Sequence, residues 1–349
     1  MSTVGVIVNP VAGKDIRRLV TSASHTSDSA KIGMVRRTVI AAVEAGAQRV
    51  LVAADPHHLG RRAVDGLALP VYVLDEPVTG SRYDTIAAAT RMWKENVGAV
   101  VALGGDGTCR DVAIGWPDVP LIAVSTGTNN AYPMAIDATS AGAAAGLVAC
   151  AAVDVAVVSR RSKRISVHID DDGIEGGVPD DLALVDLALI DTTFVGSRAV
   201  LDPSTVRVVI ASMASPSGTG LSSIAGRAHP VGRFDDGGVA VRLGTGGRLG
   251  TGGRRVRVPL APGSFITVEI AEITPLPYGH TVRLHGPGVL AFDGERDRRI
   301  SRDATVSVSI EPTGPMLIDV DRTLAAAAAA RLFDVPLDSP GGPSWPPSS

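Results

Sequence analysis

Three glycines and an aspartate follow an apolar run in the stretch Val100-Val101-Ala102-Leu103-Gly104-Gly105-Asp106-Gly107-Thr108. The apolar run is typical of a buried strand of a parallel sheet, and Cys109–Val112 continues into an expected helix. Glycines directly after such a strand let backbone N–H groups approach an anion closely, which predicts a phosphate site. A carboxylate inside that turn would repel phosphate unless it binds a metal ion or takes a proton from an attacking hydroxyl. Asp106 is therefore the residue to explain.

A plain turn is the alternative interpretation, because Gly and Asp dominate turns. The surrounding sequence favours a site, since Leu103–Thr108 resembles the signature of the superfamily that joins NAD kinases to diacylglycerol and sphingosine kinases. Four more segments match in the expected order along the chain. Val8–Lys14 is similar to the Asn-Pro-x-(Ser/Ala)-Gly turn of lipid kinases, and Ser125–Pro133 to their Gly-Thr-x-Asn loop. Ser215–Gly226 resembles the Thr-Pro-Thr-Gly-Ser segment of NAD kinases, and Asp293–Glu295 resembles the Asp-Gly-Glu near the end of the second domain. Within the superfamily the chain looks most like the acetoin-catabolism protein X group, described as ATP-NAD-kinase-like.

The resemblance implies an α/β fold, with an N-terminal Rossmann-like parallel-sheet domain followed by a β-rich, β-sandwich-like second domain. The pattern of apolar runs predicts the same order. Five runs are expected to be parallel strands: 4–8, 49–53, 71–74, 99–103 and 121–124. Four stretches between or after them are expected to be helices: 30–45, 57–67, 83–96 and 140–151. After residue 153 the apolar residues recur with period two, as in 239–243, 281–284 and 306–310, which is typical of antiparallel strands.

These patterns divide the chain into four expected parts. Residues 1–152 would form the nucleotide- and phosphate-binding domain, and residues 153–318 the β-rich domain. Residues 319–333 would form a closing helix, and the segment 334–349, rich in Pro, Ser and Gly, a disordered tail. The ligand is expected in the cleft between the two domains, outside the carboxyl ends of the parallel strands.

The resemblance implies a kinase that transfers a phosphoryl group from ATP, or from polyphosphate, to a hydroxyl of NAD or a related small molecule. Catalysis would need Mg²⁺ and N–H donors to neutralise the transferred group. The chain lacks the Asn-Glu dipeptide with which NAD kinases hold the adenosine of NAD, so the acceptor stays open. A lipid kinase and a non-catalytic nucleotide sensor linked to acetoin catabolism are the alternatives.

Each matching segment implies roles for its residues. Asp106 and Glu295 would be catalytic, Asp106 as a base or as a metal ligand. The phosphates would be bound by Asn9, Gly104, Gly105, Gly107, Thr108, Gly127 and Thr128, and the acceptor by Asn129, Asn130, Ser217, Gly218 and Thr219.

Asp293 and Glu295 allow two interpretations. In a strand, residues two apart point to the same side, so the two could form an acidic pair with Asp293 as a ligand of Mg²⁺. Asp293-Gly294 is equally a hairpin-turn signal.

Three other segments are given simpler interpretations. His57-His58 is expected to be an exposed helix start, because no partner cluster for a metal accompanies it. The basic run Arg160–Arg164 is expected to be a solvated entry to the next strand, with a route for a polyanionic donor as the alternative. The tandem repeat 243–254 is expected to be a flexible hairpin loop.

The composition of the chain argues against several classes of binding partner. The formal net charge of −3 over 349 residues offers no basic field for nucleic acid or an anionic membrane. Two cysteines suggest neither a disulfide framework nor a zinc site. The sequence shows no leader peptide and no long apolar run, so membrane insertion is not expected and a cytoplasmic location is. The resemblance is also compatible with a homo-oligomer.

Overall fold

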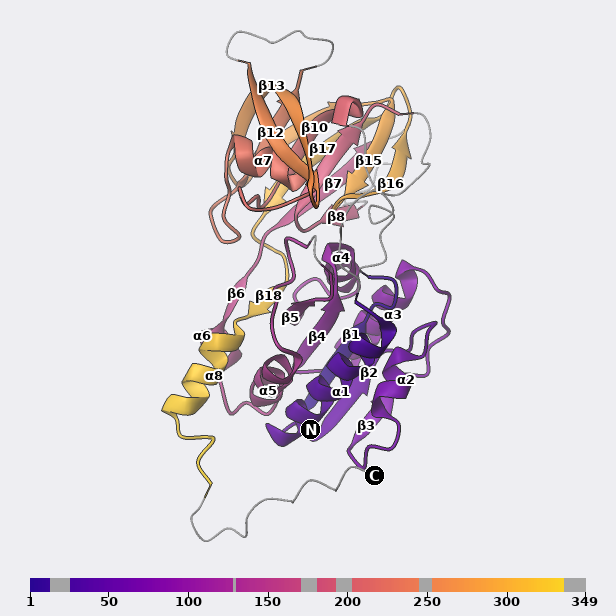
Figure 1. Cartoon of the computed structure of the whole chain (residues 1–349), viewed down its shortest axis with the longest axis vertical. Helices are drawn as coiled ribbons and strands as arrows, with labels where there is room; N and C mark the ends of the chain where they lie inside the picture. Colours follow the sequence, from indigo (N-terminus) through magenta and orange to yellow (C-terminus); the bar gives the residue numbers. More distant parts are fainter. Residues whose placement is uncertain (13–25, 128–129, 171–180, 193–202, 245–252, 336–349) are drawn as a thin grey trace.

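The computed structural model describes residues 1–12, 26–127, 130–170, 181–192, 203–244 and 253–335. The chain forms two lobes, one on either side of helix α4 and strand β8 (Figure 1). We call residues up to 161, together with residues 316–335, the N-terminal lobe, and residues 162–315 the second lobe. In the described ranges no helix is both long and apolar enough to span a membrane.

A parallel sheet forms the centre of the N-terminal lobe, as the apolar runs predicted. Its strand order is β3-β2-β1-β4-β5-β18-β6. The five parallel strands expected from the sequence are β1 (Thr3–Val8), β2 (Arg49–Val52), β3 (Val71–Val73), β4 (Ala99–Gly104) and β5 (Pro120–Ser125).

Helices cover both faces of this sheet, which explains why its strands are apolar throughout. Val101 and Leu103 of β4 belong to one core cluster, whereas Val100 and Ala102 belong to the cluster on the opposite face. The helices are α1 (Asp28–Glu44), α2 (Leu59–Val64), α3 (Arg82–Lys94), α4 (Asp106–Gly115) and α5 (Ala138–Ala149).

The expected domain boundaries at 153 and 318 are wrong in one respect. Strands β6 (Ser159–Arg161) and β18 (Met316–Ile318), which we had assigned to the second domain, complete the N-terminal sheet. Strand β18 pairs parallel with β5 and antiparallel with β6. Helices α6 (Val155–Val158) and α8 (Val320–Ala329) flank them, and α8 is the expected closing helix. The segment from residue 336 on lies outside the described residues.

The second lobe is antiparallel, as the period-two pattern predicted. Its sheets have the orders β12-β13-β11-β10-β9-β15-β16 and β14-β17-β7-β8, and an apolar cluster lies between them. The strands are β7 (Arg164–Asp170), β8 (Asp181–Ala183), β9 (Asp186–Ile190), β10 (Val206–Ala211), β11 (Gly238–Leu243), β12 (Arg254–Ala261), β13 (Ser264–Leu276), β14 (Thr281–His285), β15 (Gly288–Phe292), β16 (Glu295–Ile300) and β17 (Thr305–Glu311). Helix α7 (Ser222–Ala228) packs on the other face of the larger sheet.

The tandem repeat does not join a hairpin, contrary to expectation. It connects β11, which ends at Leu243, to β12, which begins at Arg254. Both strands pair with β13, on its opposite sides, and so they are not partners of each other. Residues 245–252, most of the repeat, lie outside the described residues.

Candidate active site

The candidate site lies where the order of the N-terminal sheet reverses direction. The chain proceeds from β1 to β2 and β3 on one side, and from β4 to β5 on the other. In open α/β sheets, the crevice outside the carboxyl ends of two such strands is the usual ligand site. Asn9 follows β1 and Gly105 follows β4. The Asn9 amide Nδ2 donates to Thr108 Oγ1 at 2.9 Å, so a hydrogen bond crosses this crevice.

Two glycines of the turn, Gly104 and Gly105, have close neighbours. A β-carbon on Gly104 would overlap the Thr108 side chain, and one on Gly105 would lie 2.9 Å from Asn130 Oδ1. Above Gly107 a β-carbon would still have room, since it would lie 3.8 Å from Glu295 Oε1. The same distances show that Asn130 and Glu295 meet the glycine turn from β5 and from the second lobe. The turn, Thr108, Asn9, Asn130 and Glu295 thus form one cluster, as the resemblance implied.

Asp106 is the first residue of α4 and is held by the loop after β5. Its carboxylate accepts hydrogen bonds from the backbone N–H of Ala131 at 3.0 Å and of Tyr132 at 2.8 Å. Both N–H donors and the positive end of the helix dipole favour the ionised form of a carboxyl group. Asp106 is therefore oriented and stabilised as a carboxylate, which a base must be before it can accept a proton.

A buried lysine, Lys31, shapes the Asn9 loop. Asn9 Oδ1 accepts from the N–H groups of Val11 and Ala12. Lys31 Nζ, on α1, donates to the backbone carbonyls of Asn9, Pro10 and Ala12 at 3.1, 2.7 and 2.7 Å. These bonds compensate for the burial of the ammonium group. Sequence reasoning missed Lys31, because nothing in a helical pattern marks a lysine that turns inward.

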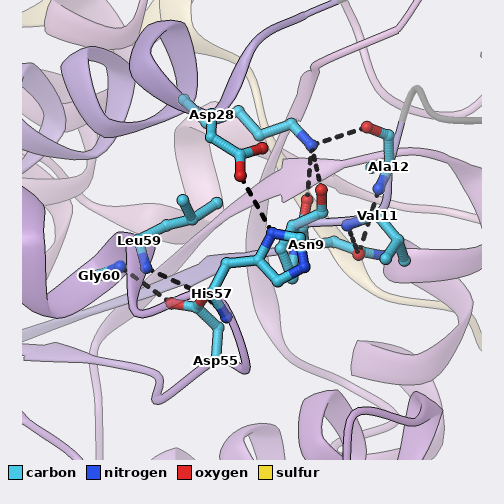
Figure 2. Close-up of polar contacts among 10 residues, drawn as sticks. Asn9, Val11, Ala12, Asp28, Asp55, His57, Leu59 and Gly60 are labelled. Carbon is cyan, nitrogen blue, oxygen red and sulfur yellow. Dashed lines mark hydrogen bonds and ion pairs between the residues drawn. The ribbon is translucent and has the colours of Figure 1, made fainter.

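His57 is paired, although its residue type in a helix start suggested only exposure. Figure 2 shows its ring directed at Asp28, with 3.0 Å between Nδ1 and Asp28 Oδ2. Asp55 holds the turn before α2, because its carboxylate accepts from the N–H groups of His57, Leu59 and Gly60. Among the residues that the structure describes, no group of three or more His, Cys, Asp or Glu side chains could hold a metal ion.

Asp293 is a structural carboxylate, and the strand interpretation of the acidic pair is wrong. Asp293 (φ 49°) and Gly294 (φ 80°) form the hairpin turn between β15 and β16, in which Phe292 pairs with Glu295. The turn directs the Asp293 carboxylate to the N–H groups of Leu184 and Val185, at 3.0 and 2.7 Å. Burial raises its pKa well above the ordinary value. The carboxylate is therefore enclosed by backbone amides, and only Glu295 of the pair lies at the glycine turn.

Of the residues predicted to bind the acceptor, only some are shown to lie at the glycine turn. Asn130 lies at the site and donates from Nδ2 to Ser125 Oγ at 2.8 Å, whereas Thr128 and Asn129, which follow Gly127, lie outside the described residues. In the segment before α7, Ser217 Oγ lies 2.8 Å from Ser215 Oγ, and the Gly218 N–H donates to the Ser215 carbonyl. These bonds form a turn within the segment that holds Ser217, Gly218 and Thr219. A role in binding an acceptor stays a prediction for all three.

Two family models match adjoining parts of the chain. Residues 4–149 match the ATP-NAD kinase N-terminal domain, and residues 163–313 match the acetoin catabolism protein X C-terminal domain. Acetoin catabolism protein X of Cupriavidus necator is 38% identical over 341 residues, which cover 95% of this chain and 93% of that protein. The chain belongs to the acetoin catabolism protein X family. The resemblance to the NAD kinase superfamily is thereby confirmed.

The fold of this family member is also that of a solved kinase. Yeast NADH kinase, in a structure complexed with NADH, superposes with a TM-score of 0.52 at 14% sequence identity. The match covers 97% of this chain and 90% of that protein. At this identity the likeness concerns the fold, and it confirms a parallel-sheet lobe followed by a β-rich lobe.

Helix α4 joins the two lobes of this family member through an arginine. Arg110 is buried and donates from Nε to the Leu182 carbonyl and from Nη2 to Asp181 Oδ2, both at 2.7 Å. Its guanidinium lies 4.4 Å from the centre of the Phe292 ring. The helix that begins with Asp106 is therefore fixed to β8 and β15 of the second lobe.

A second charged pair lies beside it. Asp111 accepts a hydrogen bond of 2.9 Å from Arg82 Nε of α3. Burial raises the pKa of Asp111 to about 6, even though Arg82 and Arg110 both act to lower it. The Asp111 carboxyl group of this ion pair therefore loses its proton near pH 6.

Arg233 is a further residue that sequence reasoning missed. It comes from the second lobe and donates from Nη2 to the carbonyl of Ala131 at 2.9 Å. A single arginine in a segment rich in Gly and Asp carries no sequence signal of its own, and only the fold brings it to the loop that holds Asp106.

Proposed function

We propose that this chain is a kinase that transfers a phosphoryl group from ATP to a hydroxyl of NAD or of a related small nucleotide. The observation that carries the proposal is the glycine turn at the start of α4, with an oriented carboxylate inside it and Asn9, Thr108 and Glu295 around it. The match to the ATP-NAD kinase N-terminal domain supports the same reaction class.

The geometry suggests a division of labour. The N–H groups at the start of α4 would bind the phosphates of the donor, since a helix N-terminus is a ready anion site. The Asn9–Thr108 hydrogen bond would keep the walls of the crevice at a fixed distance. Asp106 would accept the proton of the acceptor hydroxyl. At the same time the hydroxyl oxygen would bond to the γ-phosphorus of ATP, and the bond between that phosphorus and the leaving ADP would break. Glu295 would bound the crevice from the second lobe.

The described residues do not fit a metal held by the protein alone. Asp293 is enclosed by amides, and no cluster of three suitable side chains occurs in the described ranges. Mg²⁺ commonly arrives with nucleotide phosphates and keeps several of its waters. We therefore assign no residue to it and derive no step through it.

Asp106→Asn tests the proposal. The amide still accepts from Tyr132, so the fold should persist, but it cannot take up a proton, and transfer of label from γ-labelled ATP should fall by at least about 10²-fold. Asp137→Asn is the matched control, because Asp137 is an exposed N-cap of α5 and Asn caps helices as well as Asp does. Wild-type turnover in the Asp106→Asn protein would exclude Asp106 as the base. The same assay with polyphosphate identifies the donor.

A nucleotide sensor is the second candidate, and one observation favours it. The hydrogen bonds from Ala131 and Tyr132 to Asp106 hold a loop together whether or not chemistry follows. If the wild-type protein binds ATP but transfers phosphate to no acceptor, the sensor is the better assignment.

A further inference from the structure

Arg233 lies on a short loop of the second lobe that is held at both ends. Lys163 Nζ donates to the carbonyls of Gly232 and Gly237, at 3.0 and 2.8 Å. Asp235 accepts from the Gly232 N–H at 2.6 Å, and the Arg160 guanidinium lies 4.1 Å from the centre of the Phe234 ring. We call residues 232–237 the arginine loop. Such bracing gives the Arg233 side chain a fixed origin.

The bracing also corrects the interpretation of the basic run. Arg160 and Arg161 are exposed, as expected, but Ser162 and Lys163 are buried, with 1% and 4% of their surface exposed, so the run is only in part a solvated entry to β7. Burial lowers the pKa of Lys163 to about 8, although Asp235 and Asp236 oppose this. The run is therefore a support for the arginine loop.

From this loop the Arg233 guanidinium crosses to the N-terminal lobe. Its Nη2 donates to the Ala131 carbonyl at 2.9 Å, and its centre lies 5.1 Å from that of the Tyr132 ring. Tyr132 is itself fixed, because its hydroxyl lies 2.8 Å from Ser162 Oγ next to Lys163. The arginine loop and the loop after β5 thus form one packed unit.

One peptide group connects Arg233 to Asp106. The carbonyl that accepts from Arg233 and the N–H of Tyr132 that donates to Asp106 Oδ1 at 2.8 Å belong to the same peptide, between Ala131 and Tyr132. Hydrogen bonds in such a chain polarise one another, so a cation on the carbonyl side strengthens donation on the N–H side. Arg233 Nη1 is buried without a hydrogen-bond partner, so no second acceptor competes with the Ala131 carbonyl at this nitrogen.

The titratable groups around Asp106 come from both lobes. Burial raises the pKa of Asp293 well above its ordinary value and the nearby Asp106 raises it further, while Glu295 lies beside Gly107. On α4 itself the Cys109 thiol is fully buried, and burial raises its pKa, which keeps it neutral. Among the cations, Arg110 binds Asp181 and the Leu182 carbonyl, whereas Arg233 donates a hydrogen bond to the loop that holds Asp106.

We propose that Arg233 is a positioning residue for Asp106, which holds that carboxylate ionised and oriented through the Ala131–Tyr132 peptide. The second lobe would thereby determine whether the N-terminal lobe carries a working base. The inference gives Asp106 a partner that the proposed function does not require, and it rests on that function only for its effect on turnover.

The direct test follows the carboxyl carbon of Asp106 by NMR in protein labelled at Asp Cγ, with the signal assigned by its loss in Asp106→Asn. The apparent pKa of Asp106 should rise by about 1 in Arg233→Met, since an opposite charge nearby lowers a carboxyl pKa by about 1–3. Arg233→Lys keeps the charge and should return the value close to that of the wild type. Arg242→Met is the control, because it removes a cation of the second lobe that pairs with Glu272 and not with the Ala131 carbonyl.

An unchanged Asp106 titration in Arg233→Met would overturn the proposal. If that protein does not fold, Arg233→Gln removes the charge, keeps a donor for Ala131 and is judged by the same criterion. In the kinase assay, kcat should fall in Arg233→Met while the KM for ATP stays unchanged. When Arg233→Met is added to Asp106→Asn, the double variant should lose little more activity than Asp106→Asn alone. If the wild type transfers no phosphate, the proposed function fails while the carbon titration still decides the role of Arg233.

Discussion

At the scale of single residues, Gly104 and Gly107 of the turn have different surroundings. Gly104 is needed for packing, because a methyl group there would overlap Thr108. Gly107 has room for a methyl group, but that group would occupy the space between the start of α4 and Glu295. The fold therefore requires Gly104, whereas Gly107 is required only if the proposed ligand binds at the turn.

This difference can be tested with the same substitution at both positions. Gly104→Ala should destabilise the protein by at least about 1–3 kcal/mol, the usual cost of overpacking. Gly107→Ala should leave the melting temperature unchanged or raised, since Ala favours a helix over Gly by about 1 kcal/mol. It should weaken ATP binding at least about tenfold, because one charge-assisted hydrogen bond is worth about 1.5–3 kcal/mol. Thermal melts and calorimetric titration with ATP provide both quantities. Unaltered ATP affinity in Gly107→Ala would place the phosphates elsewhere.

The residue scale is also where sequence reasoning was least complete. It placed Asp106, Asn9, Thr108, Asn130 and Glu295 at one site, and the fold brings them together, because each stands in a segment that resembles the superfamily. Lys31 and Arg233 stand in no motif, and their roles come from side chains that turn into the fold to reach backbone carbonyls. A lone lysine or arginine is normally solvated, so no rule of composition or spacing selects these two.

At the scale of elements, strands that are apolar on both faces were predictable and short ones were not. The five parallel strands were placed to within two residues at either end, because each is an apolar run bounded by polar or glycine residues. Strands β6 and β18 have three residues each, and their pairing joins Leu317 to Arg160 across the whole second lobe. A local pattern cannot report such a contact, which is why the domain boundaries were misplaced.

The ion pair between α3 and α4 gives a pH dependence at this scale. The pKa of Asp111 in the folded state, about 6, lies above its ordinary value of 3.8. The folded protein therefore holds this proton more tightly than the unfolded chain does, and the resulting stabilisation is fully present below about pH 4 and lost as the pH rises through 6. Its upper limit is about 3 kcal/mol, at about 1.36 kcal/mol per pH unit.

Asp111→Asn removes this titration. The free energy of unfolding of the wild type minus that of Asp111→Asn should therefore decrease between pH 4 and pH 7. Urea denaturation of both proteins at four pH values measures the difference, in which the other carboxyl groups cancel. A difference that does not vary with pH would show that burial does not perturb Asp111.

At the scale of the whole molecule, the candidate site is a joint between lobes. Arg110 fixes α4 to β8 and β15, Glu295 meets the glycine turn, and Arg233 reaches the loop that holds Asp106. All three contacts connect parts of the chain more than 70 residues apart in sequence. A ligand bound between the lobes would contact both of them at once, so its binding should stabilise the molecule as a whole.

The class of ligand can be identified from this stabilisation, because any ligand specific for the native state raises the melting temperature with its concentration. If the acceptor is a small nucleotide, both ATP with Mg²⁺ and NAD should protect the protein, whereas dispersed diacylglycerol should not. At a concentration 100 times the dissociation constant, the protection is worth about 2.7 kcal/mol, which is readily seen in a thermal melt. Gly107→Ala serves as the control, since protection by ATP should shrink there if the glycine turn is the site. Protection by ATP and diacylglycerol without NAD would reassign the acceptor to lipids, because the lipid would then occupy the position that we give to a nucleotide beside Asp106.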